Sequence, residues 1–138
     1  MTITESFLLM LAIIESGNKD IPGDFRKGIP LAQGPFQIHA CTVAEANRIA
    51  KLHGLPPGFY TLEDRRDYYM ARAMAYDVLA YWKPILEKRF KMKWTEADAL
   101  AFWRWGPGQW TPKSKDHKID KERTEKYERL CRNHGRRG

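Results

Sequence analysis

The sequence is short of the features that mark several large classes of protein. It has only two cysteines, Cys41 and Cys131, which is too few for a disulfide framework. Neither has a His or Cys companion at zinc spacing, and we expect both to be buried thiols rather than a bridged pair. The four histidines show no ligand spacing either, so we expect no metal and no cofactor.

Long hydrophobic runs and targeting signals are also missing. No apolar stretch reaches the length that spans a membrane. Residues 7–14 are about as long as a signal-peptide core, but Glu5 precedes them and no Lys or Arg does. No small-residue cleavage site follows them. We therefore expect no signal peptide and no encoded secretion route.

No internal repeat, low-complexity tract or linker divides the chain, and 138 residues suit one domain over residues 1–138. An excess of basic residues, 24 Lys and Arg against 17 Asp and Glu, gives a net charge of +7. Such a charge favours polyanions: nucleic acid, an anionic membrane or the acidic polymers of a bacterial wall. A basic C-terminal region is formed by Lys113, Lys115, Lys118 and Lys121 together with the terminal Arg136 and Arg137. It is either a solvated face or a surface attracted to the wall or to outer-membrane lipid.

The pattern of apolar residues predicts an almost wholly helical protein. Capping-box patterns that begin at Thr2, Thr42, Thr61 and Thr95 mark the starts of helices, and a last charged helix covers residues 119–133. Pro84 should kink or split the long helix that follows Thr61. Residues 17–35 are rich in Gly and Pro and are predicted as an irregular loop, with a short β-hairpin as the alternative.

The first helix ends in an unusual way. Its apolar run, Phe7–Ile14, leads directly to Glu15, and Gly17 is a natural stop. Apolar neighbours and the negative end of the helix dipole both disfavour ionisation, so we predict a raised pKa for Glu15. An acid that keeps its proton near neutral pH can donate it to a leaving oxygen, as glycoside cleavage requires. The alternative is a helix-terminal Glu that points into water.

The order Glu15-Ser16-Gly17, a loop, then Gly34-Pro35-Phe36-Gln37-Ile38 resembles the lysozyme-like superfamily. In that superfamily a catalytic Glu ends a buried helix, and a Gly-x-x-Gln-hydrophobic segment forms the facing wall of the sugar cleft. The best match is to goose-type lysozymes and soluble lytic transglycosylases. Their aromatic-rich helix that runs into Gly-x-Gly is similar to Phe102–Gly108, and their closing Thr-x-x-Tyr is similar to Thr124–Tyr127.

The resemblance implies a mainly helical, lysozyme-like domain whose loop or hairpin forms one wall of the cleft. Gln37 and Ile38 would line that wall and bind the N-acetyl group of the sugar, with a loop-stabilising role for the Gln37 amide as the alternative. Trp103 and Trp105 offer flat faces to sugar rings, but residues two apart do not share a side of a helix, so one should be core. Tyr127 matches a Tyr that often points at the catalytic Glu, with core packing as the rival.

Departures from the family concern the second carboxylate. A two-carboxylate glycosidase needs an acid facing the first one. The places where relatives carry acids hold Ala32, Gly28 and His39 here. Asp24, nine residues after Glu15, is the only remaining candidate, with a plain turn residue as the alternative. Without Asp24, Glu15 would act alone as acid and then base, as in lytic transglycosylases, so the missing acids favour transglycosylation over hydrolysis.

The sequence thus predicts a glycosidase that cleaves the β-1,4 bond between N-acetylmuramic acid and N-acetylglucosamine in peptidoglycan. We expect a monomer whose partner is the glycan strand and not nucleic acid. A short, basic chain without a signal fits a phage endolysin or virion lysin that is made in the host cytoplasm or carried in a virion and acts on the murein of the periplasm. The alternatives are a chitin-cleaving relative, a catalytically silent wall-binding homologue, and a basic nucleic-acid binder, for which no recognised motif is present.

Overall fold

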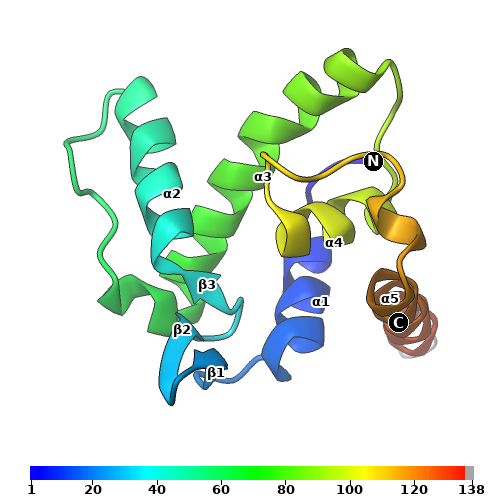
Figure 1. The fold of residues 1–138 in the computed structure, drawn as a ribbon, viewed down its shortest axis with the longest axis horizontal. Coiled ribbons are helices and arrows are strands. Elements are labelled where there is room, and N and C mark those ends of the chain that lie inside the picture. The colour runs from blue at the N-terminus through cyan, green and yellow to red at the C-terminus, as the bar shows by residue number, and fades with distance from the viewer. Residues whose placement is uncertain (136–138) are drawn as a thin grey trace. The chain divides into compact units, whose positions relative to one another are not determined.

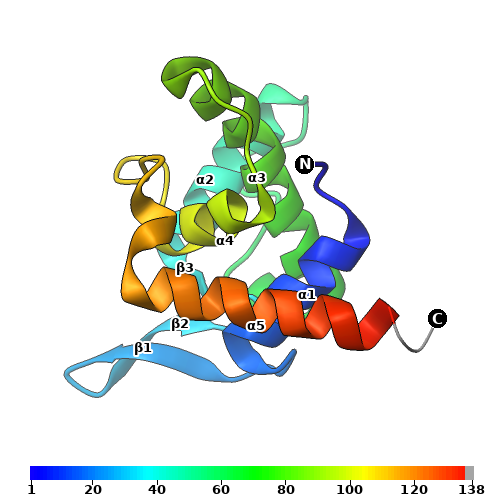
Figure 2. The same ribbon diagram turned by 90° about the vertical axis from the view of Figure 1, so that its right-hand side faces the viewer.

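The protein is mainly helical, as predicted (Figure 1, Figure 2). A computed structural model describes residues 1–135, and within them it contains five α-helices and a three-stranded antiparallel sheet. The chain forms two compact units: the sheet unit, Thr4–Val78, and the C-terminal unit, which comprises residues 1–3 and the chain from Leu79 onward. The prediction of a single domain over residues 1–138 stays a prediction.

The sheet unit is built around a buried first helix. Its elements in chain order are α1 (Glu5–Ser16), β1 (Pro22–Arg26), β2 (Ile29–Gln33), β3 (Ile38–His39), α2 (Ala40–Leu52), the 3-10 helix η1 (Glu63–Arg66) and the first part of α3 (Tyr68–Phe90). Along α1 the buried side chains are Phe7, Leu8, Met10, Leu11 and Ala12. They occur in successive turns and on more than one side, so α1 belongs to the interior, as its all-apolar sequence predicts.

The Gly- and Pro-rich segment after α1 forms a β-hairpin, which was the alternative to the irregular loop. Strands β1 and β2 pair antiparallel, with Arg26 opposite Ile29, and β2 pairs in turn with β3. The hairpin turn consists of Lys27 and Gly28, whose φ angles of +51° and +75° are both positive, as a type I′ turn requires. Hydrophobic alternation could not reveal these strands, because most of their residues are exposed.

The C-terminal unit is held together by an aromatic cluster. Its elements are the second part of α3, α4 (Glu96–Trp105), the 3-10 helix η2 (Ser114–Asp116) and α5 (Lys118–Gly135). The ring of Trp94 lies 5.2 Å from that of Phe102 and 5.3 Å from that of Trp110, and Phe90 packs edge-on against Trp110. Helix α3 runs through Pro84 as one element, so Pro84 does not split it, and the alternative of a kink at Pro84 stays a prediction.

The predicted helix starts are right in one case and displaced in three. Thr95 and Asp98 form the reciprocal capping box that opens α4, as predicted. Helix α1 is capped by Thr4 rather than Thr2, and α2 begins at Ala40, before Thr42. The reciprocal bonds between Thr61 and Asp64 do form, but they open η1 instead of the long helix.

The two cysteines are free thiols, as predicted, but the prediction that they are buried is wrong, because both are exposed. Cys41 lies two residues before Val43, a core residue of α2, and residues two apart point to different sides of a helix. Cys131 lies on α5, whose composition is dominated by charged residues, most of which are exposed. A count of cysteines could not decide between these environments.

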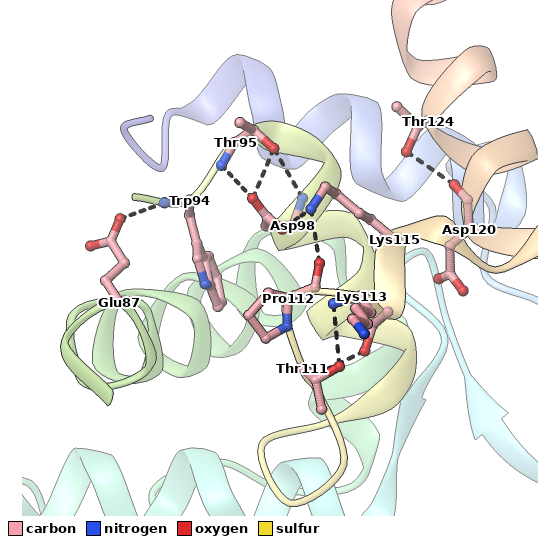
Figure 3. Close-up of polar contacts among 11 residues, drawn as sticks. Glu87, Trp94, Thr95, Asp98, Thr111, Pro112, Lys113, Lys115, Asp120 and Thr124 are labelled. Atoms are coloured by element: carbon pink, nitrogen blue, oxygen red, sulfur yellow. Dashed lines mark hydrogen bonds and ion pairs between the residues drawn. The ribbon is translucent and has the colours of Figure 1, made fainter. Parts of the chain in front are cut away.

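Buried carboxylates anchor the helices of the C-terminal unit; Figure 3 shows the bonds of Glu87 with Trp94 and of Asp98 with Thr95. Asp120, 1% exposed, receives two hydrogen bonds from the guanidinium of Arg104, at 3.0 and 2.7 Å, and one from the indole N–H of Trp105 at 3.1 Å. Glu87 accepts the backbone N–H of Trp94 at 2.7 Å and the ammonium of Lys83 at 3.1 Å. Burial alone would raise the pKa of Asp120, but the bonds from Arg104 and Trp105 outweigh it and lower the pKa.

Replacing Asp120 with Asn should lower the free energy of unfolding by about 2 kcal/mol at neutral pH, because charge-assisted bonds to Arg104 are lost. The folded state lowers the Asp120 pKa from its ordinary 3.8, so this stabilisation is complete above that value and disappears as the pH falls through the folded pKa. Denaturant unfolding at a series of pH values from 7 into the acid range should therefore show a shrinking difference in unfolding free energy between the wild type and Asp120→Asn. Glu122→Gln on the exposed side of α5 is the control; an advantage that is absent at pH 7 or constant with pH would contradict the assignment.

Candidate functional site

Glu15 lies where the sequence predicts it, in the last turn of α1, and it is half-buried. The two residues one turn earlier, Leu11 and Ala12, are fully buried. Gly17 ends the helix in the left-handed conformation at φ +70°, and its N–H donates to the carbonyl of Ile13 at 2.8 Å. The Glu15 carboxylate is thus attached to a rigid helix end beside a hydrophobic core.

The next residue, Ser16, connects the helix end to the distant Gly-x-x-Gln segment. Its hydroxyl donates to the backbone carbonyl of Pro35 at 2.7 Å. The hydroxyl oxygen also lies 3.2 Å from the backbone carbonyl of Ala12, a second possible acceptor. The same oxygen accepts the backbone N–H of Lys19 at 3.0 Å. Two sequence segments that suggested a site, nineteen residues apart, are therefore in direct contact through Ser16 and Pro35.

The Gly-x-x-Gln segment forms a tight turn whose first residue must be glycine. Gly34 has φ +88°, and a Cβ atom there would overlap with the backbone carbonyl of Arg65. Phe36 is fully buried and stacks on Tyr68 with ring centroids 5.7 Å apart. The turn is consequently packed against η1 and the start of α3, and it presents a fixed surface beside the end of α1.

Gln37 acts as the brace of this turn. It has a left-handed backbone, with φ +52°, which is uncommon for a residue other than glycine. Its side-chain amide donates to the carbonyls of Ile21 at 2.8 Å and Gly34 at 3.0 Å, so both amide hydrogens are engaged. In the structure the Gln37 amide therefore stabilises the loop, which is the alternative role that the sequence allows. Ile38 is 1% exposed, and its carbonyl accepts a hydrogen bond from the guanidinium of Arg65 at 3.2 Å, so it belongs to the core and offers almost no surface to a ligand.

Asp24, the candidate second carboxylate, lies in β1 with φ +50° and is exposed. One carboxylate oxygen is 3.2 Å from Nε2 of His39 on β3, so the side chain reaches across β2. The pair can only be ionic when His39 is protonated.

The remaining candidates belong to the C-terminal unit. Trp103 and Trp105 on α4 are both half-buried, so neither is simply core. The Trp105 ring lies 4.9 Å from that of His117, and its indole N–H is committed to Asp120. Tyr127 on α5 is half-buried; burial, a hydrogen bond with Cys131 and the negative charge of Glu96 raise its pKa, so the phenol is neutral at physiological pH.

Sequence reasoning missed the residues that support the candidates. Asp120 accepts hydrogen bonds from both Arg104 and Trp105. Its sequence neighbours include lysines, which is typical of an ordinary surface acid. Asp20 holds the loop before β1, because it accepts bonds from Gln33 at 2.7 Å and Arg66 at 2.9 Å, and these bonds lower its pKa despite some burial. Each partner is distant in the chain, so no local pattern could identify it.

Within residues 1–135 no group of three or more His, Cys, Asp or Glu residues is placed to hold a metal ion. In the same range no helix is long and apolar enough to cross a membrane. No protein-family model matches the chain, and no curated protein or solved structure matches it significantly.

Ser16→Ala should loosen the contact between α1 and the Gly34–Gln37 turn. Loss of the bonds to Pro35 and Lys19 is expected to cost about 1 kcal/mol of unfolding free energy. Amide hydrogen exchange should also speed up at Lys19, whose N–H loses its acceptor. Ser6→Ala, at an exposed position of the same helix, is the matched control. Unchanged stability together with unchanged exchange at Lys19 would show that the Ser16 bonds do not hold the two segments together.

Proposed function

We propose that this protein is a peptidoglycan glycosidase that cleaves the β-1,4 bond between N-acetylmuramic acid and N-acetylglucosamine, with Glu15 as its general acid and base. The observation that carries the proposal is the 2.7 Å bond from the Ser16 hydroxyl to the Pro35 carbonyl. It brings together the Glu-Ser-Gly and Gly-x-x-Gln segments that resemble the two walls of the sugar cleft in lysozyme-like enzymes.

The local surroundings of Glu15 suit an acid catalyst. Glu15 is half-buried, so it combines partial removal from water with partial exposure. It projects from the carbonyl end of α1, where the helix dipole disfavours a negative charge. A protonated carboxyl in that place can donate to the glycosidic oxygen as the bond to the leaving sugar breaks.

Transglycosylation fits the carboxylates of the sheet unit better than hydrolysis. Asp24 is exposed and lies beside His39, an arrangement that suits a surface pair more than a nucleophile. In the single-acid route, Glu15 gives its proton to the leaving oxygen while the substrate's N-acetyl group stabilises C1. The Glu15 carboxylate then takes the proton of the muramyl 6-hydroxyl, whose oxygen bonds to C1 and forms a 1,6-anhydro ring.

The net charge of +7 supports a polyanionic setting such as a wall that carries acidic polymers. We propose a lysin of the phage type, active on murein, with the glycan strand as its partner. The C-terminal lysines would add attraction to that wall.

Glu15→Gln should reduce turbidity clearing of murein suspensions by at least about a hundredfold, because the amide cannot supply the proton. Glu5→Gln is the matched control, since Glu5 is an exposed acid on the same helix and its only ion pair described, with Arg72, is a long one of 3.7 Å. Both variants should unfold at the wild-type temperature. Full activity in Glu15→Gln would remove Glu15 from the mechanism, and binding to murein without any clearing by the wild type would indicate a silent wall-binding protein.

The products of murein digestion identify the reaction. Mass spectrometry should find 1,6-anhydromuramic ends, and Asp24→Asn should change the rate less than about threefold, because exposed surface pairs contribute little. Reducing ends, together with a large loss of rate in Asp24→Asn, would instead establish hydrolysis with two carboxylates.

A further inference from the structure

The tip of the β1–β2 hairpin, at the left-hand end of the light-blue ribbon in Figure 2, carries apolar and basic residues that are exposed. Phe25 is 57% exposed and Ile29 is 64% exposed, which are high values for large hydrophobic side chains. Pro30 beside them is exposed as well, and the whole segment from residue 24 to residue 30 is in contact with water. Nothing in the proposed cleavage reaction uses these side chains.

The register of the hairpin distributes its apolar groups over both faces. Phe25 lies opposite Pro30, and Arg26 lies opposite Ile29. Residues directly opposite each other share a face and successive residues alternate, so Phe25 and Ile29 point to different faces. A flat partner surface could cover only one of them. Covering both requires a medium that surrounds the tip.

The charge of the tip indicates the nature of that medium. Arg26 and Lys27 are exposed, and neither pairs with a carboxylate among the residues that the structure describes. Lys27 also holds a turn position with φ +51°, where Asn or Gly would be less strained. Two unpaired cations beside two exposed apolar side chains match a negatively charged surface with an apolar interior.

We propose that the hairpin tip, residues 25–30, inserts into the headgroup region of an anionic lipid bilayer. Phe25 and Ile29 would enter the boundary of the acyl chains from both faces of the hairpin, while Arg26 and Lys27 bind lipid phosphates. The type I′ turn fixes this arrangement before contact, so little conformational entropy is lost on binding. This proposal is independent of the glycosidase proposal, because it concerns lipid and not the glycan strand.

The test is co-sedimentation of the whole protein with vesicles of phosphatidylcholine that contain about one quarter phosphatidylglycerol. Wild-type protein should bind them, should bind pure phosphatidylcholine vesicles far less, and should be partly released by high salt. Phe25→Ser with Ile29→Ser should weaken the partitioning by about tenfold or more, since the apolar contact is removed. Arg26→Glu with Lys27→Glu should abolish the preference for anionic lipid and serves as an independent second variant.

The matched control is Leu52→Ser with Lys51→Glu, at the end of α2 in the same unit, where Leu52 is 62% exposed. This control should bind vesicles within about twofold of wild type, because residues 51 and 52 lie outside the tip. Equal vesicle binding by wild type and both tip variants would overturn the proposal. The proposal would also be overturned if the tip variants lost the digestion of lipid-free murein as strongly as they lost vesicle binding. That result would mean that the tip contacts glycan. Loss of vesicle binding with digestion of lipid-free murein intact would support the proposal, as would vesicle binding by a wild type that digests nothing.

Discussion

The contact between the Ser16 hydroxyl and the Pro35 carbonyl is the interaction on which the candidate site depends. It fixes the end of a buried helix, with Glu15 in its last turn, against a turn that Gly34 and Gln37 make rigid. Gly34, Phe36 and Gln37 each have a packing or hydrogen-bonding role in that turn. The catalytic hypothesis therefore needs only one group, the Glu15 carboxylate, to act on a substrate.

The end of α1 and the capping box that opens α4 could be predicted, because their sequence signals are local. An apolar run followed by Glu15 and Gly17 defines a helix stop in one segment, and Thr95-x-x-Asp98 defines a helix start in four residues. The resemblance to lysozyme-like enzymes predicts that Gln37 contacts the sugar, which stays a prediction. The structure shows that the Gln37 amide donates hydrogen bonds that hold the turn.

The features that escaped prediction depend on partners distant in the chain. Most residues of the hairpin strands are exposed, so no hydrophobic alternation marks these strands. Asp120 gains its importance from Arg104, sixteen residues away, and the composition of its own segment suggests the surface. From the sequence, Asp24 can be interpreted as a catalytic acid or as a turn residue. Its spatial neighbour His39 could be found only from the pairing of three strands.

The most direct measurement is an NMR titration of the Glu15→Gln protein with a peptidoglycan tetrasaccharide, which this variant should bind without cleaving. The account predicts that the largest backbone amide shifts fall on residues 15–17 and 34–38, on both sides of the Ser16–Pro35 contact. Shifts confined to other parts of the chain, or no shifts at saturating sugar, would contradict it.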